Sequence, residues 1–339
     1  PIVASLGFAL SPLIIIWSRT AVSDALLTGT LGISLLLFWR RMASENNDQC
    51  ISAWVFLGFA ILTKGPVAFV LAALTITSFL FCQKNWERLL GKINPKKGLL
   101  ITILISIPWY ILEFIKVGKP FWDSFFGYHN FQRYTSVVNN HAEPFWFFLY
   151  IMLIASLPFT PFLCHGIFET FKDFLKSSKK NSIVSETLYT YSLCWLISVL
   201  TFFSISATKL PSYWLPAIPA AAILISNSFI SLKNSHKNHF YLWLSSILIF
   251  FGISLVFFFS NLWLSLINDP EMPNLVSELI SSGIIFKAKL FLSSFTLFAI
   301  ILFSIKSKNI FLYLQILLLI GQFFLMSPIR KLADTSRQL

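Results

Sequence analysis

The sequence predicts an all-α protein that crosses a membrane many times. Charged residues make up 12% of its 339 residues, against roughly 25% in an ordinary globular domain. Hydrophobic residues reach 56%, and many of them form apolar runs near the ~17–25 residues that a membrane-spanning helix needs. Helices are expected because hydrocarbon offers backbone N–H and C=O groups no other partner.

Ten or eleven spanning helices are expected along the chain, several of them short. The apolar runs lie near 2–17, 25–39, 51–63, 66–82, 99–115, 145–163, 187–206, 211–232, 239–259, 290–305 and 309–326. We expect residues 1–339 to form a single membrane module. The first residue is not Met, and the last follows soon after a span, so we also expect the protein to continue beyond both ends.

The basic residues predict the orientation in the membrane. The net charge is +12, but the Lys and Arg residues are scattered among short loops, which argues against a nucleic-acid-binding face. If the loops alternate sides, more than half of the 26 Lys and Arg fall on one side, for example in 84–97 and 172–180. By the positive-inside rule this side is cytoplasmic.

The four cysteines do not indicate a disulfide framework. Cys50, Cys82 and Cys164 are expected at cytoplasmic helix ends, and Cys194 is expected inside a span. No Cys-x-x-Cys motif occurs, so a cysteine-based zinc site is not expected either.

Two longer connections are expected on the outer side. The first, 116–144, is dense in aromatic and ionisable residues, and the second, 261–289, contains an Asp-Pro-Glu-Met-Pro segment before an apolar, serine-rich stretch. Aromatic, amphipathic segments lie in membrane interfaces. Each connection is therefore expected to hold an interfacial helix.

The first candidate site lies between the first two expected spans. Arg19 and Asp24 are close together at the membrane edge. An arginine can bind a phosphate with two parallel hydrogen bonds, and an aspartate can orient or deprotonate a hydroxyl. The alternative is that Asp24 caps the following helix, because Asp is an ordinary N-cap residue.

Two lysines are further candidates on the outer side. Lys64 precedes a Gly-Pro turn, and Lys209 precedes Pro211 and Pro216. Prolines leave backbone carbonyls unpaired, which a membrane protein tolerates where the chain lines a cavity. The alternatives are a snorkelling lysine at a helix end for Lys64 and a proline-marked helix start behind a headgroup lysine for Lys209.

The aromatic connection holds the remaining candidates. His129 and Arg133 would share a face if this piece is helical. His129, His141 and Glu143 are residue types that bind a divalent metal, although their spacing matches no standard zinc signature. The alternative is an interfacial anchor made of aromatic rings. With the basic residues above, the outer side suits an anionic lipid phosphate.

These motifs, in this order, resemble the bacterial aminoarabinose transferase and protein O-mannosyltransferase group of GT-C glycosyltransferases. The resemblance covers most of the first 220 residues. The matching elements are Arg19-x4-Asp24, Leu62-Thr63-Lys64-Gly65-Pro66, His129-x3-Arg133-Tyr134, His141-x2-Pro144-Phe145-Trp146-Phe147-Phe148 and Lys209-x-Pro211-x-Tyr213-x2-Pro216-x2-Pro219.

The resemblance implies a GT-C bundle that moves a sugar from a polyprenyl-phosphate carrier to a lipid, glycan or protein acceptor. The enzyme would lie in a bacterial cytoplasmic membrane, with its active site on the extracytoplasmic face and inversion at the sugar. A divalent metal is a possible cofactor. The resemblance implies that the main base lies in an acidic loop upstream of Pro1, with Asp24 as a supporting carboxylate. The implied substrate-binding residues are Arg19, Lys64, Arg133, Tyr134, Lys209 and Tyr213.

Two other functions remain open from the sequence. A secondary transporter or flippase also has broken helices and isolated charges, but its polar groups are expected near the middle of spans. An oligosaccharide polymerase or ligase shares the polyprenyl donor, but its expected arginine-rich outer loop is missing, because 116–144 contains only Arg133.

Overall fold

The computed structural model describes residues 1–18, 22–44, 50–83, 85–137, 143–177, 184–234, 240–265 and 275–305, together with Tyr313 and Leu317. The chain forms two compact units, Pro1–Asn234 and Ser235–Leu339. Each is described by itself. The expectation of a single module stays a prediction.

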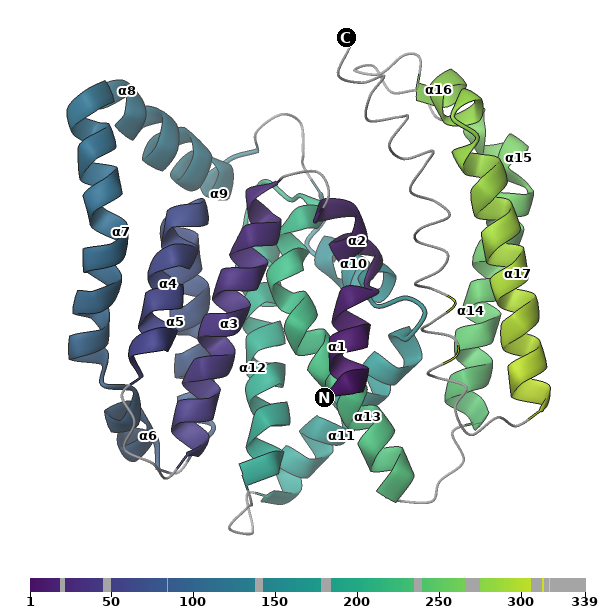
Figure 1. The fold of residues 1–339 in the computed structure, drawn as a ribbon, viewed down its shortest axis with the longest axis horizontal. Coiled ribbons are helices and arrows are strands. Elements are labelled where there is room, and N and C mark those ends of the chain that lie inside the picture. The colour runs from purple at the N-terminus through teal and green to yellow at the C-terminus, as the bar shows by residue number, and fades with distance from the viewer. Residues whose placement is uncertain are drawn as a thin grey trace. The chain divides into compact units, whose positions relative to one another are not determined.

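Unit 1 contains the candidate site, and its described residues are largely helical (Figure 1). Its elements are α1 (Ile2–Ala9), α2 (Pro12–Trp17), α3 (Ser23–Ala43), α4 (Ile51–Lys64), α5 (Pro66–Phe81), α6 (Trp86–Ile93), α7 (Pro95–Val117), α8 (Lys119–Trp122), the π-helix η1 (Asp123–Gln132), α9 (Arg133–Thr135), α10 (Phe147–Ala155), α11 (Thr160–Ser177), α12 (Val184–Ile205), the 3₁₀ helix η2 (Pro211–Ala217) and α13 (Ile218–Asn234). Unit 2 contains α14 (Phe240–Phe258), α15 (Ser260–Leu264), α16 (Leu275–Ser281) and α17 (Ile284–Ser304).

The helical membrane fold predicted from the sequence is confirmed. Among the described residues, five helices are long and apolar enough to cross a membrane, or six if a bent pair counts as one span. The five lie at 86–117, 188–205, 211–232, 240–258 and 284–304. Helices α4 and α5 are apolar but shorter. Of the expected span at 309–326, only Tyr313 and Leu317 are described.

Proline-containing segments divide two of the expected spans. The run near 2–17 forms α1 and α2, and Pro12 begins the second helix. The run near 145–163 forms α10 and the start of α11, which meet at a bend of 113°, and Pro158 lies between them. Proline has no N–H and disfavours the α conformation in the residue before it, so a helix ends more readily there than hydropathy alone suggests.

Helices α12 and α13 lie at the centre of unit 1. In the apolar stretch of α12, 56% is buried inside the protein, and in the segment made of η2 and α13 the buried share is 67%. The corresponding share for α6 with α7 is 17%. Trp195 of α12 and Trp214 of η2 are completely buried. Unit 1 therefore encloses α12 and α13, whereas α7 keeps most of its apolar surface outside.

The described part of the 116–144 connection is helical. Gly118, at a φ of +74°, ends α7 and leads into α8, η1 and α9, which pass over the ends of α4 and α5 in Figure 1. A Cβ placed on Gly65 would lie 3.1 Å from the ring of Phe125. The outer segment therefore meets the turn between α4 and α5. Its position in a membrane interface stays a prediction, as does that of 261–289, whose residues 266–274 lie outside the described ranges.

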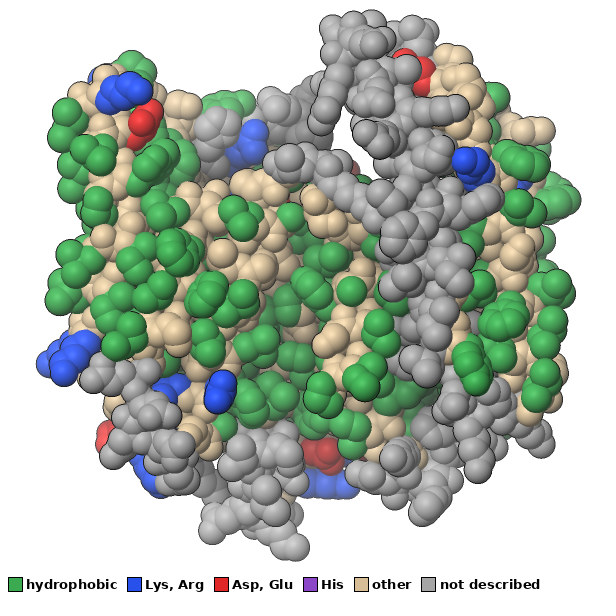
Figure 2. Space-filling model, in the orientation of Figure 1, with side chains coloured by type: hydrophobic (Ala, Val, Ile, Leu, Met, Phe, Trp, Pro, Cys, Tyr) green, Lys and Arg blue, Asp and Glu red, His purple; other side chains and the backbone are tan. Residues whose placement is uncertain are grey.

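The surface of unit 1 has the distribution expected for a membrane protein. On the face shown in Figure 2, hydrophobic side chains cover the middle, and Lys and Arg side chains lie towards the ends of the helices. Exposed apolar side chains on α7 include Leu104, Leu112 and Ile115. In water such a surface would be unfavourable, but in lipid it is matched by hydrocarbon.

Candidate functional site

The candidate site begins with an ion pair between α3 and α4. Asp24 lies in the first turn of α3 and is buried. Its Oδ1 pairs with Nζ of Lys64, the last residue of α4. Gly65 follows at a φ of +82°, which glycine adopts readily and which lets the chain turn directly into α5. Packing of α3 against α4 thus joins two residues that the sequence places 40 positions apart.

Lys64 also contacts an aromatic ring from the proline-rich segment. Its Nζ lies 4.5 Å from the ring centroid of Tyr213 in η2, which is within the range of a cation–π interaction. The Tyr213 ring stacks on Phe203, with centroids 5.0 Å apart. Pro211 and Pro216 both lie within η2, and proline favours such short 3₁₀ pieces because it cannot supply the N–H of a continued α-helix.

Arg133 is a second cation of the site. It starts α9 directly after the π-helix, and its guanidinium carbon lies 5.9 Å from the ring centroid of Tyr128. Its Nε is buried and has no hydrogen-bond partner among the described residues.

Backbone hydrogen bonds hold Arg133 against the segment before η2. The N–H of Thr208 donates to the carbonyl of Arg133 at 3.2 Å, and the N–H of Ala207 donates to that of Tyr134 at 2.9 Å. The Thr208 hydroxyl donates to the carbonyl of Ser136 at 2.9 Å. The Tyr134 ring stacks on Phe202, with centroids 5.0 Å apart. These contacts fix the end of the outer segment beside α12.

Lys209 lies next to this junction and is 7% exposed. Its Nζ donates to the carbonyl of Ser206 at 2.7 Å, and it forms no ion pair with any residue that the structure describes. A buried ammonium with a neutral partner is incompletely compensated. A nearby anion would therefore be stabilised here.

The structure brings together most of the residues that the sequence predicted. Asp24, Lys64 and Tyr213 touch, and Arg133, Tyr134 and Lys209 are joined to them through the backbone contacts and ring stacks above. The cluster has three cations but a single carboxylate among its described members. This excess of positive charge is the main electrostatic feature of the site.

One of the alternatives considered for these residues is wrong. Asp24 is not the helix cap, because α3 begins at Ser23 and its N-cap residue is Val22. The ammonium of Lys64 is paired with Asp24, and its position relative to lipid headgroups stays a prediction.

The remaining predicted residues are outside this cluster or outside the described part. Arg19 and His141 lie outside the described residues, and His129 is described only in its backbone. Glu143 is described and exposed. No group of three or more His, Cys, Asp or Glu suited to a metal occurs in the described ranges of the chain. The metal site at His129, His141 and Glu143 therefore stays a prediction.

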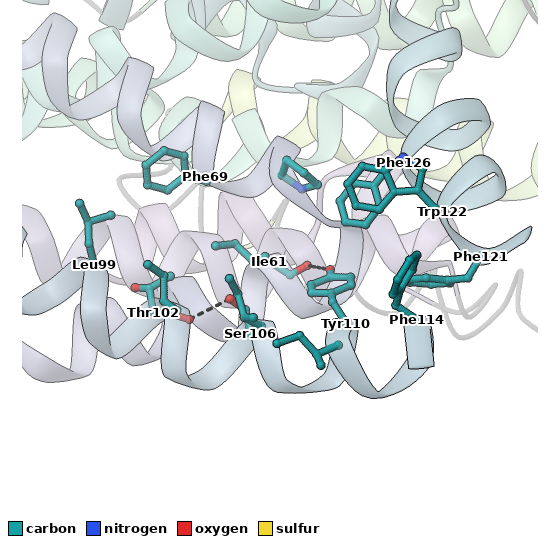
Figure 3. A pocket seen from close by; sticks show the side chains of 14 residues that line it. Ile61, Phe69, Leu99, Thr102, Ser106, Tyr110, Phe114, Phe121, Trp122 and Phe126 are labelled. Carbon is teal, nitrogen blue, oxygen red and sulfur yellow. Dashed lines mark hydrogen bonds between the residues drawn. The ribbon is translucent and has the colours of Figure 1, made fainter. Parts of the chain in front are cut away.

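An apolar groove of about 560 Å³ lies beside the cluster. It runs along α7, and side chains of α4, α5, α8 and η1 also line it (Figure 3). The three hydroxyl groups in its lining are all hydrogen-bonded. The hydroxyl of Thr102 donates to the Trp54 carbonyl at 3.0 Å, that of Ser106 to Thr102 at 2.8 Å, and that of Tyr110 to Ile61 at 2.7 Å. The groove thus offers almost only hydrocarbon.

The groove adjoins the cluster through the end of α4. Ile61 lines the groove and is three residues before Lys64. Phe126 lines it as well, and its neighbour Phe125 meets Gly65. An apolar surface and a cationic cluster therefore lie side by side.

Sequence reasoning missed the groove and the aromatic contacts behind the site. Tyr110 lies in an ordinary apolar run, and Phe202 and Phe203 end another, so nothing in their spacing marks them. Ser204, Ser206, Thr208 and Lys209 follow one another closely at the end of an apolar run. This local rise in polarity could have indicated that the segment makes hydrogen bonds to another part of the chain.

Comparison with known proteins places this arrangement in context. Residues 2–112 match the sequence model of the dolichyl-phosphate-mannose-protein mannosyltransferase family. The undecaprenyl phosphate-alpha-4-amino-4-deoxy-L-arabinose arabinosyl transferase of Erwinia tasmaniensis is 29% identical over 219 residues, which are 63% of this chain and 37% of that protein. The enzyme of the same name from Pseudomonas aeruginosa PAO1 is 26% identical over 211 residues, or 61% of this chain and 36% of that protein.

Solved structures share the fold. The crystal structure of ArnT from Cupriavidus metallidurans bound to undecaprenyl phosphate matches with a TM-score of 0.72 and 20% identity, covering 98% of this chain and 59% of that one. Its apo form matches with a TM-score of 0.71 and 18% identity, covering 97% and 58%. The chain spans less than two thirds of the length of these relatives. The chain is thus similar in part of its sequence to these transferases, and it has the polytopic helical fold of ArnT.

Proposed function

We propose that this chain is the donor-binding part of a membrane glycosyltransferase. The enzyme takes a sugar from a polyprenyl-phosphate carrier and transfers it to a lipid, glycan or protein acceptor. The observation that carries the proposal is the cluster of Lys64, Arg133 and Lys209, which contains one carboxylate among its described residues and adjoins an apolar groove. A polyprenyl phosphate has the same two parts, an anionic head and a hydrocarbon tail.

The cations stabilise the leaving group. When the bond between sugar and carrier breaks, negative charge develops on the phosphate oxygens, and fixed donors stabilise it most where water is excluded. The buried Nε of Arg133 has no hydrogen-bond partner in the described part of the chain, and the Lys209 ammonium donates to a neutral carbonyl. We assign these two residues to the phosphate, together with Arg19, which lies before Asp24 in the sequence.

Lys64 and Asp24 act as a pair. Because Asp24 neutralises Lys64, Lys64 contributes less to phosphate binding than an unpaired lysine would. A phosphate approaching Lys64 would share its ammonium with Asp24. Asp24 is then a supporting carboxylate that holds Lys64 in place and can orient the acceptor hydroxyl. Attack on the face opposite the departing phosphate inverts the sugar.

The groove suits the polyprenyl tail. Its hydroxyl groups are already hydrogen-bonded within the protein, so a polar ligand would find few partners there. Aromatic side chains such as Phe114, Trp122 and Phe126 cover one end, as Figure 3 shows. They provide large apolar contact areas for isoprene units.

The location of the charged groups favours an enzyme over a transporter. Asp24 lies in the first turn of α3, and Lys64 is the last residue of α4. Both groups thus lie at helix ends, whereas a transporter site is expected near the middle of the membrane. With the positive-inside assignment, this end is the extracytoplasmic face of a bacterial cytoplasmic membrane.

The test uses the full-length protein in lipid nanodiscs and two ligands, undecaprenyl phosphate and a short-chain isoprenyl phosphate. Ile103→Trp fills the groove, and Ile115→Trp places the same side chain on an exposed site of α7 outside it. We expect Ile103→Trp to weaken undecaprenyl phosphate binding roughly tenfold, the loss of more than 1 kcal/mol of apolar contact. The short-chain ligand should be little affected.

Lys209→Ala tests the phosphate-binding site, as Ile103→Trp tests the site of the hydrocarbon tail. It removes charge from the head site and should weaken both ligands about equally, by roughly tenfold or more. Binding that is indifferent to Lys209→Ala would reject the head-site assignment. Equal effects of Ile103→Trp and Ile115→Trp would reject the groove as the tail site.

A further inference from the structure

Two cysteines meet where α5 and α12 pack against each other. Cys82 follows the last residue of α5, and Cys194 lies inside α12. Their sulfur atoms are 4.0 Å apart. Both are free thiols, Cys82 half-buried and Cys194 buried. The Lys64 cluster, at the other end of α5, does not involve them.

A second pair of side chains fixes the register of this contact. The hydroxyl groups of Ser78 and Ser198 are 3.2 Å apart. Ser78 lies four residues before Cys82, and Ser198 lies four residues after Cys194. Residues four apart share a face of a helix, so two successive turns of antiparallel helices match. The cysteine contact therefore belongs to an extended, matched interface.

We propose that Cys82 and Cys194 are a reversible redox site, in which a membrane-soluble oxidant of the quinone class converts the two thiols into a disulfide between α5 and α12. Disulfide sulfurs are about 2.05 Å apart, so side-chain rotation has to bring these two sulfurs closer. A quinone is the suitable class of oxidant because the contact lies between apolar helices.

The quinone accepts the electrons and protons that the two thiols lose. Two S–H bonds break and one S–S bond forms. The two electrons and two protons pass to the quinone, which becomes the hydroquinone. Cys82 is the more accessible thiol and reacts first, and Cys194 then closes the disulfide. A thiol pair in a reducing cytoplasm would return to the dithiol, as is usual for redox-sensing disulfides.

The cross-link would act at a distance from the cationic cluster. Helix α5 has 16 residues, which corresponds to about 24 Å between its first turn near Lys64 and the cysteine pair. A disulfide here ties α5, which follows the Lys64–Gly65 turn, to α12, which leads into the Lys209 segment. The inference does not depend on the proposed transferase activity.

The competing explanation is plain packing. A buried cysteine behaves as a small apolar side chain, and small residues let membrane helices approach closely. Under that explanation the sulfurs touch but need not form a bond.

The experiment uses the full chain in nanodiscs with Cys50→Ser and Cys164→Ser, so that only Cys82 and Cys194 remain. A short-chain benzoquinone is added, the protein is denatured, and the remaining thiols are counted by the mass added by a maleimide. We expect both thiols to disappear within one chain and to return with dithiothreitol. Adding Cys82→Ser should slow the loss of the remaining Cys194 thiol by about tenfold or more, because a buried thiol lacks its partner.

Two results would overturn the proposal. One is that both thiols still react with maleimide after oxidation. The other is that disulfides form only between separate chains. If the serine background does not fold, peptide mapping of the oxidised wild type replaces it, and a missing Cys82–Cys194 cross-linked peptide then has the same meaning. In the wild type, Cys50 is the internal control: it is a buried free thiol that is not part of this contact, and it should still react with maleimide after oxidation and denaturation.

Discussion

Arg133→Ala is the most direct test of the cationic cluster. The Arg133 guanidinium makes no ion pair among the described residues, and its Nε has no hydrogen-bond partner. Its truncation therefore removes few internal interactions beyond the contact with the Tyr128 ring. A charge-assisted hydrogen bond contributes about 1.5–3 kcal/mol. We expect the Kd for undecaprenyl phosphate to rise by roughly 10- to 150-fold.

Arg133→Lys distinguishes the contribution of the positive charge from that of the planar guanidinium group. It keeps the positive charge but loses the planar fork that binds two phosphate oxygens. We therefore expect a Kd between those of the wild type and Arg133→Ala. An identical Kd for the lysine and alanine variants would mean that charge at this position does not contribute.

The assay is equilibrium binding of undecaprenyl phosphate to the full-length protein in nanodiscs, at fixed ionic strength. Arg88→Ala is the matched control, because Arg88 is an exposed arginine on α6 and no part of the cluster. The reasoning is refuted if Arg133→Ala binds within twofold of the wild type, or if Arg88→Ala weakens binding equally.

Three further tests concern the contacts around the cluster. Asp24→Asn removes the negative charge beside Lys64, so undecaprenyl phosphate should bind roughly 3- to 10-fold more tightly, while sugar transfer falls about 100-fold; weaker binding would contradict the paired assignment. Tyr213→Phe keeps the ring under the ammonium and should leave thermal stability unchanged, whereas Tyr213→Leu should lower the free energy of unfolding by about 0.5–2 kcal/mol. Gly65→Ala and Gly118→Ala both place a Cβ at positive φ, but at Gly65 alone the Cβ also meets an aromatic ring. Unfolding measurements should show Gly65→Ala as the less stable variant, by about 1 kcal/mol or more; equal losses would mean that the ring moves aside.

The helical membrane fold could be predicted because its signal is local. A helix in hydrocarbon satisfies its own backbone, so an apolar run of sufficient length predicts one directly. The boundaries were less certain where proline occurs. The run near 2–17 forms two helices separated before Pro12, and the run near 145–163 bends by 113°. Hydropathy averages over such positions and does not show the break.

The candidate site could be predicted in its residues but not in its contacts. The short motifs around Asp24, Lys64, Arg133 and Lys209 were visible because a charge beside an apolar span is unusual. Considered one at a time, these motifs also allowed Asp24 to be the N-cap of the following helix. Only the structure shows Asp24 neutralising Lys64 and the backbone of Arg133 held by Thr208.

The sequence by itself determined that this protein is a helical membrane protein with cations near the ends of its helices. The tertiary structure decided which of these charges neutralise one another, where the apolar groove lies and that Cys82 meets Cys194. The physical reason is the range of the interactions. Helix formation depends on neighbours within a few residues, whereas an ion pair or a groove depends on how distant helices pack, and no periodicity in the sequence specifies that register.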